Sequence, residues 1–241
     1  MNLPSKKNKE QFVRDMFNSI APRYDLLNTL MSLGMDRRWR LLAVKRSRVL
    51  PGGRALDICC GTGMLTLELA RAVGREGHVI GLDFSQNMLD IARQRVNRSP
   101  LQGIIDLVSG NAMSLPFEEN SFDAVTVGWG LRNVPDIKTV VKEMERVVKP
   151  GGMVVSLDMA KPELPVFKQI YWLYFEKLVP LMGKVWAKQE TAYSYLHNSA
   201  RAFTHQKELA NIFRETGLVE TGYTNLFGGV VALVAGKKPQ I

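Results

Sequence analysis

The feature that most constrains the fold is an alternation of short apolar runs with helical stretches between residues 51 and 159. The runs read A-L-D-I-C-C, G-H-V-I-G-L-D-F, I-I-D-L-V-S-G, F-D-A-V-T-V-G-W and M-V-V-S-L-D-M. A helix is expected from Met64 to Val73, Ser85 is placed to cap the next one, and K-P-G-G is expected to form a turn before the fifth run. Strands that alternate with helices form a parallel, doubly wound sheet with right-handed crossovers. The sequence therefore predicts an α/β domain with helices on both faces of the sheet.

Helical segments are expected on both sides of this core. Apolar residues recur at helical spacing through residues 1–50, which are expected to form a helical N-terminal cap with Asp36 as the N-cap of its third helix. Residues 163–203 are rich in aromatic residues and are predicted to form a helical insertion on the substrate side. A later helix is expected to end at Gly217 in the left-handed cap position, before two β-rich runs that pair antiparallel. We therefore expect a single domain over residues 1–241 with a mostly parallel, seven-stranded sheet.

The composition is that of an ordinary globular protein. Apolar residues make up 46% and charged residues 23% of the chain, which argues against extensive disorder. The first residues do not resemble a secretory signal, and the most apolar long segment, Val166 to Trp186, is interrupted by charged residues, so it is not expected to span a membrane. The only cysteines, Cys59 and Cys60, are adjacent and have no nearby Cys or His with which to form a zinc site. These observations predict a cytoplasmic protein without a bound metal ion.

A glycine loop follows the first apolar run, in the sequence Asp57-Ile-Cys-Cys-Gly61-Thr62-Gly63. A parallel strand followed by glycines and a helix places the helix N-terminus at the ligand crevice beyond the strand ends. The loop fails the dinucleotide fingerprint G-x-G-x-x-G because Thr66 stands where Gly or Ala is needed, which disfavours a dehydrogenase. Asp57 would repel phosphates and would attract a cationic amino group, so the loop favours a ligand that carries such an amino group.

Two further strand ends carry polar residues suited to a nucleoside. Asp83 ends the second run, where a carboxylate can accept hydrogen bonds from both hydroxyls of a ribose; a helix-capping aspartate is the alternative. Asn111 and Ala112 follow the third run, where an amide and backbone groups can bracket an adenine edge; a simple loop is the alternative. The sequence therefore predicts a nucleoside site that crosses neighbouring strand ends.

These motifs together resemble the Rossmann-like, class I, S-adenosylmethionine-dependent methyltransferases. The resemblance lies in D-I-C-C-G-T-G, in G-L-D, in G-N-A before L-P-F, and in V-V-K-P-G-G. It implies that the glycine loop lies under the methionine part of the cofactor and that Asp57 faces the ammonium group. The cofactor-binding residues that it implies are Asp57, Gly61, Thr62, Gly63, Asp83, Asn111, Ala112 and Gly128.

A narrower resemblance covers nearly the whole chain. F-N-S-I-A-P-R-Y-D-L-L-N, S-L-G-M-D-R-R-W-R and N-S-F-D-A-V-T-V-G-W-G-L-R-N-V-P-D are similar to segments of the C-methyltransferases of ubiquinone and menaquinone biosynthesis. Y-S-Y-L-H-N-S-A-R-A-F favours the menaquinone branch, while the ubiquinone branch stays open as the alternative. Two residues depart from many relatives: Asp158 replaces a glutamate, and Gly128 replaces a serine of some members. The resemblance implies methyl transfer from S-adenosylmethionine to a ring carbon of a polyprenylated quinol.

This reaction needs a group that stabilises the quinol after it loses a hydroxyl proton. Arg132 and Asn133 follow the fourth run, where a charged guanidinium can donate to a phenolate; a structural pair of Arg132 with Asp136 or Asp158 is the alternative. The predicted catalytic residues are Arg132, Asn133 and Asp158. The predicted substrate-binding residues are Tyr24, Trp129 and Tyr195, with core packing as the alternative for the aromatic side chains.

The net charge of +9 leaves other partners to consider. A nucleic-acid methyltransferase is disfavoured because the segment after the fourth run reads G-L-R-N-V-P, and because neither cysteine is placed as a nucleophile. A non-catalytic protein of the same fold is a further alternative. We expect a small-molecule quinol as the partner and no nucleic acid, and we leave open a homodimer and a peripheral contact with the inner face of the cell membrane.

Overall fold

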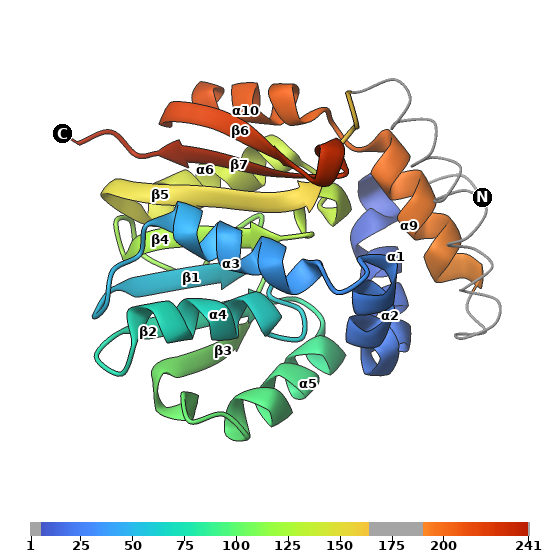
Figure 1. The fold of residues 1–241 in the computed structure, drawn as a ribbon, viewed down its shortest axis with the longest axis horizontal. Helices are drawn as coiled ribbons and strands as arrows, with labels where there is room; N and C mark the ends of the chain where they lie inside the picture. Colours follow the sequence, from blue (N-terminus) through green and yellow to red (C-terminus); the bar gives the residue numbers. More distant parts are fainter. Residues whose placement is uncertain (1–5, 164–189, 241) are drawn as a thin grey trace.

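The structure is a computed structural model that describes residues 6–163 and 190–240. A seven-stranded sheet with the order β3-β2-β1-β4-β5-β7-β6 forms its centre (Figure 1). The strands are β1 (Arg54–Ile58), β2 (His78–Asp83), β3 (Ile105–Ser109), β4 (Phe122–Gly128), β5 (Val148–Met159), β6 (Val219–Leu226) and β7 (Val231–Lys237). Only β7 is antiparallel to its neighbours, β5 and β6. The predicted mostly parallel, seven-stranded sheet is confirmed.

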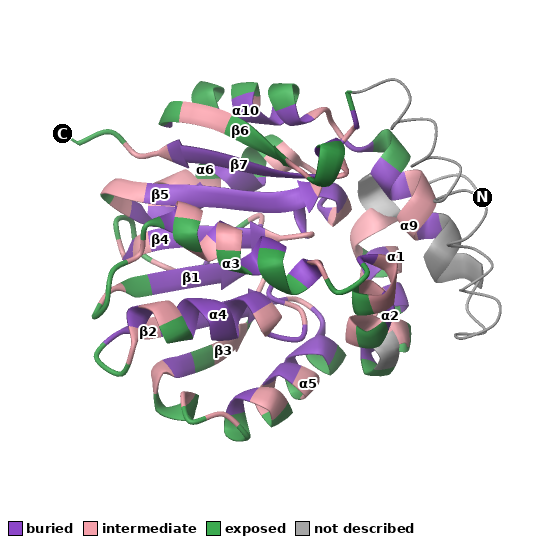
Figure 2. Ribbon diagram, viewed as in Figure 1, coloured by how far each residue is buried: buried purple, intermediate pink, exposed green. Residues whose placement is uncertain are grey.

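Helices cover both faces of the sheet (Figure 1). One layer contains α3 (Asp36–Ser47), α4 (Met64–Val73) and α5 (Gln86–Asn97), and the other contains α6 (Ile137–Val147) and α10 (Gln206–Glu215). Each layer shares an apolar cluster with the strands, so the central strands are buried on both sides (Figure 2). The mostly apolar character of the central runs is the consequence, because parallel strands between two helical layers have no face in water.

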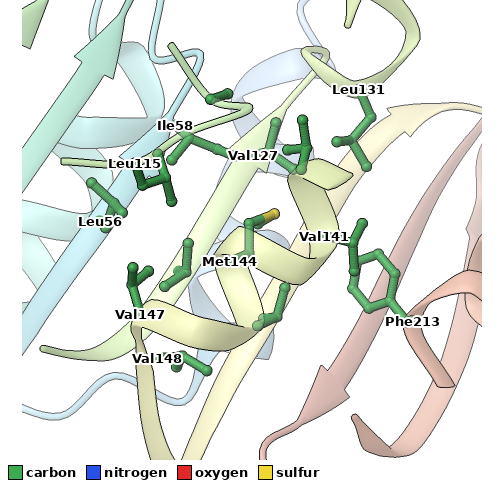
Figure 3. Close-up of a cluster of buried hydrophobic side chains, with 14 of the residues drawn as sticks. Leu56, Ile58, Leu115, Val127, Leu131, Val141, Met144, Val147, Val148 and Phe213 are labelled. Atoms are coloured by element: carbon green, nitrogen blue, oxygen red, sulfur yellow. The ribbon is translucent and has the colours of Figure 1, made fainter. Parts of the chain in front are cut away.

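Helix α6 shows how the sequence pattern produces this packing. Val140, Val141, Met144 and Val147 recur at helical spacing, and none of them is exposed. They face Leu56, Ile58 and Val127 of the sheet (Figure 3). Asp136 caps the helix through a hydrogen bond of 2.9 Å from the Thr139 amide. A cap of this kind stabilises a helix by about 1 kcal/mol.

A group of helices lies beyond the carboxyl ends of the parallel strands (Figure 1). It contains α1 (Lys6–Ile20), α2 (Tyr24–Met31) and α9 (Glu190–Ala202), and a 3-10 turn (Ala21–Arg23) joins the first two. Asn18 anchors α1 on α5, since its side-chain oxygen accepts a hydrogen bond of 2.7 Å from Ser85. The N-terminal helices are therefore as predicted. The predicted insertion is described only as α9, because residues 164–189 lie outside the described residues.

Two local predictions were wrong. Asp36 is not an N-cap: Met35 occupies the cap position, while the Asp36 carboxylate accepts a hydrogen bond from Ser32 and pairs with Arg40 inside the protein. The predicted K-P-G-G turn belongs instead to the beginning of β5, where the pairing register with β4 shifts and Gly151 adopts a φ of +80°. In both cases contacts between distant elements outweigh the local preference.

Over the ranges that the structure describes, none of the helices has the length and apolar character that a bilayer crossing requires.

Candidate active site

Three adjoining pockets lie between the strand ends and the helices beyond them. We call them the strand-end pocket (about 700 Å³ with its open mouth), the loop pocket (about 410 Å³) and the helix pocket (about 470 Å³). Asp83, Asn111, Ala112 and Asn133 line the first; Asp57, Gly61 and Thr62 line the second; Leu27, Met31, Arg132 and Tyr195 line the third. Tyr24 lines all three, and Gly128 and Trp129 line the first two. The structure thus gathers nearly all of the predicted site residues around one connected space.

The glycine loop turns sharply between β1 and α4. Gly61 has a φ of +55° and Gly63 one of +77°, a region that side chains disfavour. Gly63 occupies the N-cap position of α4, and a Cβ atom there would lie 3.2 Å from the Cβ of Ala92. Among the predicted cofactor residues, Gly63 alone lines none of the three pockets. Its role in the site is therefore to shape the loop, whereas Gly61 and Thr62 border the ligand space.

Asp57 lies at the bottom of the loop pocket and is completely buried. One carboxylate oxygen accepts a hydrogen bond of 2.7 Å from Thr66, and the other accepts one of 2.9 Å from Thr126. Burial raises the pKa of Asp57 to about 7, although both threonine hydrogen bonds act in the opposite direction. The side chain is therefore fixed in place, and its charge responds to whatever cation occupies the pocket.

Asp83 connects the glycine loop to β2 and also lines the strand-end pocket. Its carboxylate accepts hydrogen bonds from the amides of Gly61, at 2.8 Å, and Ser85, at 2.9 Å. Burial raises the pKa of Asp83. A carboxylate offers about four acceptor positions, so two backbone bonds leave capacity for a ligand hydroxyl on each oxygen. The capping and ligand-binding interpretations are compatible in this geometry.

Asn111 is held in place from two sides. Its side-chain oxygen accepts a hydrogen bond of 2.9 Å from the Met113 amide, and its side-chain nitrogen donates one of 3.1 Å to Glu10 of α1. Glu10 itself lines the strand-end pocket, as does Phe84, whose ring lies 5.4 Å from the guanidinium carbon of Arg14. Glu10 could not be predicted, because nothing local in the sequence relates α1 to the third strand. Phe84 could have been found from its place directly after Asp83.

The fourth strand ends in a strained turn at Trp129, which has a φ of +54°. The Trp129 amide donates a 2.6 Å hydrogen bond to Leu157 on β5, while its carbonyl accepts bonds from Arg132 at 2.7 Å and Asn133 at 3.1 Å. Directly before the turn, a Cβ atom at Gly128 would lie 3.2 Å from Leu65. Gly128 therefore packs closely against Leu65 at a position that borders both the strand-end and the loop pocket.

Arg132 is a buried cation paired with Asp158 of the neighbouring strand. Its Nη1 donates to the Asp158 carboxylate at 3.0 Å, and the guanidinium is part of the wall of the helix pocket. Burial disfavours the charge, but the Asp158 carboxylate outweighs it and raises the pKa of Arg132. Asp136, the other predicted partner, instead caps α6. Within the described part of the chain, the Nε of Arg132 is buried without a hydrogen-bond partner, so the ion pair leaves a donor available.

Asn133 and Tyr195 connect two of the pockets. The Tyr195 hydroxyl donates a hydrogen bond of 3.1 Å to the side-chain oxygen of Asn133, which lines the strand-end pocket, while Tyr195 lines the helix pocket. Burial raises the pKa of Tyr195 to about 12, and burial also raises that of Tyr24. Both phenols are therefore neutral hydrogen-bond donors near pH 7.

Solved structures share this fold at low sequence identity. A methyltransferase from Thermotoga maritima that depends on S-adenosylmethionine superimposes with a TM-score of 0.66 at 22% identity, covering 94% of this chain and 99% of its own. A second such methyltransferase, from Aquifex aeolicus, gives 0.60 at 18% identity, covering 82% and 88%. These likenesses confirm the Rossmann-like class I methyltransferase fold.

The sequence relatives are much more similar. A demethylmenaquinone methyltransferase of Desulfitobacterium hafniense is 61% identical over 98% of this chain and 93% of its own length. The protein of the same name from Bacillus pumilus is 50% identical over 97% and 99%. Residues 5–238 match the ubiE/COQ5 methyltransferase family. The chain therefore belongs to the ubiE/COQ5 methyltransferase family.

Proposed function

We propose that this chain methylates a ring carbon of demethylmenaquinol, with S-adenosylmethionine as the methyl donor. The observation that carries the proposal is the position of Arg132: a buried guanidinium with an unpaired donor forms part of an apolar pocket next to the cofactor loop. The name shared by relatives that are 46–61% identical supports the menaquinone precursor as the acceptor. The ubiquinone precursor is the alternative acceptor.

The residues of the strand-end and loop pockets fit the cofactor. Asp83 is available to the ribose hydroxyls, and Asn111 and Ala112 border the space for the adenine. Asp57 supplies negative charge toward the ammonium group, and Gly128 borders both pockets. When bound, S-adenosylmethionine supplies an electrophilic methyl group on its sulfonium. The protein's part is to hold this group at a fixed place beside Tyr24 and Trp129, which border both pockets.

The helix pocket fits the acceptor ring. Met16, Ile20, Leu27 and Met31 give it an apolar wall that suits a naphthoquinol and the first part of its prenyl tail. Arg132 provides a permanent positive charge near the ring hydroxyl, which lowers the cost of ionising it. Tyr24, which remains protonated, adds a donor for a ring oxygen, whereas the hydroxyl proton of Tyr195 is donated to Asn133. Because arginine itself does not deprotonate in proteins, we assign Arg132 to stabilising the phenolate rather than to taking its proton.

Orientation is the second contribution of the protein. The hydrogen bond from Tyr195 to Asn133 fixes the boundary between the helix and strand-end pockets. An acceptor held against this boundary has its ring directed toward the cofactor side. Alignment of this kind supplies up to about 7–11 kcal/mol of the barrier reduction in favourable cases.

The direct test combines the purified protein, S-adenosylmethionine and a chemically reduced demethylmenaquinone with a short prenyl tail. We expect a product that is heavier by one methyl group, with the label on the ring carbon when the methyl group is isotopically marked. A reduced benzoquinone precursor of ubiquinone, run in parallel, tests the alternative branch. Binding of the cofactor without methylation of either quinol would contradict the proposed function.

We also propose that the turn between α2 and α3 contacts an anionic membrane surface. Leu33 is 77% exposed, and Arg37 and Arg38 at the start of α3 are exposed beside it. Leu50, which is 72% exposed, follows the opposite end of α3 and is a matched control. Leu33→Asp should reduce cosedimentation with phosphatidylglycerol vesicles severalfold, whereas Leu50→Asp should not. Equal effects of the two variants would contradict this contact.

A further inference from the structure

We propose that Arg40 binds the carboxylate of the cofactor's methionine moiety and so selects ligands that carry the complete amino acid. The inference rests on the proposed function in one respect, that the loop pocket holds the methionine end of the cofactor. It assigns a residue of α3 to cofactor recognition, whereas the sequence motifs predicted cofactor-binding residues only at the strand ends and in the loops that follow them.

Arg40 differs from the two arginines that precede it on α3. Arg37 and Arg38 are exposed, whereas Arg40 is only 6% exposed. Removing a guanidinium from water is unfavourable unless charges and hydrogen bonds compensate for it. Hydration alone therefore accounts for the charges of Arg37 and Arg38 but not for the charge of Arg40.

The compensation visible within the protein is incomplete. Arg40 donates through Nη2 to Asp36, one helical turn earlier, and its guanidinium carbon lies 5.6 Å from the centre of the Trp129 ring. Asp36 is itself held by a hydrogen bond of 3.0 Å from Ser32. In the described part of the chain, the Nε of Arg40 is buried and has no hydrogen-bond partner. An unsatisfied buried donor is destabilising, so an anionic ligand that supplies the missing acceptor would be favoured.

The position of Arg40 matches the chemistry of an amino-acid end. Arg40 lines the loop pocket, whose other lining residues include the acids Asp57 and Asp25. Asp25 is already occupied by Thr62, at 2.7 Å, and by Arg95, at 2.5 Å. Arg40 is the only basic side chain among the described residues that line this pocket, and none lines the strand-end pocket. One cation and one available acid are what a zwitterion requires, and a guanidinium is suited to bidentate binding of a carboxylate.

The alternative is that Arg40 acts only as a structural tie between α3 and the turn at Trp129. The two roles differ in what they predict for a cofactor that lacks its carboxylate. A structural tie affects all ligands of the pocket alike, because it acts through the shape of the loop. A carboxylate-binding residue affects only ligands that have the carboxylate.

The experiment compares S-adenosylmethionine with decarboxylated S-adenosylmethionine by isothermal titration calorimetry. The wild-type protein should prefer the complete cofactor at least tenfold. In Arg40→Gln this preference should disappear, because the affinity for S-adenosylmethionine falls at least tenfold while that for the decarboxylated form changes less than twofold. Arg54→Gln is the matched control: that arginine also lies over an aromatic ring, at 5.5 Å from Phe122, but lines none of the three pockets.

A second variant keeps the test decisive if Arg40→Gln does not fold. Asp36→Asn retains the guanidinium and loosens its support, so it should lower the preference for the complete cofactor severalfold. An equal loss of affinity for both cofactors, or an unchanged preference in both variants, would overturn the inference. The titration uses no quinol, so its result does not depend on whether the protein methylates demethylmenaquinol. Absence of binding of either cofactor to the wild-type protein would overturn the cofactor assignment and this inference together.

Discussion

The two halves of the site are built in different ways. The proposed cofactor side, which comprises the strand-end and loop pockets, is formed by the glycine loop and by residues at the ends of neighbouring strands, so the backbone of the sheet determines most of its shape. The proposed acceptor side is the helix pocket, which lies between α1, α2 and α9 and whose wall consists of side chains distant from one another in the sequence. A sheet places its strand ends reproducibly, whereas a pocket between helices depends on each side chain in it.

Solved methyltransferases at 18–22% identity share the fold of this chain, so the fold tolerates extensive change in sequence. We expect acceptor specificity to depend instead on side chains of the helix pocket such as Arg132 and Tyr195. We expect substitutions on the acceptor side to leave cofactor affinity unchanged, and substitutions on the cofactor side to leave the KM for the quinol unchanged.

The largest effect is expected for Arg132→Met. Turnover should fall at least tenfold, since the phenolate loses its cation, while the affinity for S-adenosylhomocysteine should stay within about twofold of wild type. The free energy of unfolding should also fall by about 3–5 kcal/mol, because Asp158 is left buried and unpaired. Steady-state kinetics, calorimetry and urea denaturation measure the three quantities.

The double variant Arg132→Met/Asp158→Asn separates stability from catalysis. It removes both charges of the buried pair, so much of the lost stability should return. Turnover should stay low if Arg132 acts on the acceptor. Recovery of turnover together with stability would mean that Arg132 is a structural residue and would contradict its catalytic assignment.

Asp83→Asn should produce the next largest effect, on the opposite side of the site. A hydrogen bond to a charged group contributes about 1.5–3 kcal/mol, so the affinity for S-adenosylhomocysteine should fall by roughly 10- to 150-fold. The KM for the quinol at saturating cofactor should remain unchanged, because Asp83 lines only the strand-end pocket. A comparable rise in the quinol KM would show that the two sides are not independent.

The residues at the strand ends could be predicted from the sequence more directly than the pocket between the helices, and the reason is physical. Asp83 ends β2, Asp57 lies one residue before the end of β1, and Asn111 follows the last residue of β3 by two positions; parallel strands bring such positions to one edge. The ion pair of Arg132 with Asp158 was one of two structural pairs that the sequence left open for Arg132. It forms because β4, which precedes Arg132, pairs with β5, which carries Asp158.

Contacts made by the N-terminal helices could not be predicted in the same way. Glu10 reaches Asn111 across 101 residues, and Asp36 turns inward to Arg40 instead of capping its helix. No local pattern encodes how α1 lies across the strand ends, since that depends on side chains such as Asn18 that bond to α5. The same limit applies to Tyr195, whose bond to Asn133 spans 62 residues.

A smaller effect, on the cofactor side, is expected from pH. Asp57 has a pKa of about 7 because of burial, so it is largely protonated at pH 6 in the free protein. An ammonium group in the loop pocket favours the ionised form, so binding should release a proton and affinity should rise as pH increases from 5.5 to 7.5. If binding lowers the pKa by one unit, which corresponds to about 1.4 kcal/mol, the affinity should rise by roughly sixfold over that range.

Asp57→Asn is the variant that isolates this effect. Burial also raises the pKa of Asp83, so the wild-type profile alone would not identify the titrating group. Calorimetry with S-adenosylhomocysteine in buffers of different ionisation enthalpy measures the released protons directly. An equal proton release in the variant and in the wild type would exclude Asp57 as their source.

The smallest effect is expected for Tyr195→Phe, on the acceptor side. The variant loses the hydrogen bond to Asn133, which contributes about 1 kcal/mol, so kcat/KM for the quinol should fall by roughly fivefold. Tyr223→Phe is the matched control, since Tyr223 is 38% exposed and lines none of the three pockets. Cofactor affinity should be unchanged in both variants. A larger loss of cofactor affinity than of kcat/KM in Tyr195→Phe would show that the helix pocket shapes the cofactor side, because the hydroxyl of Tyr195 is linked to the strand-end pocket through Asn133.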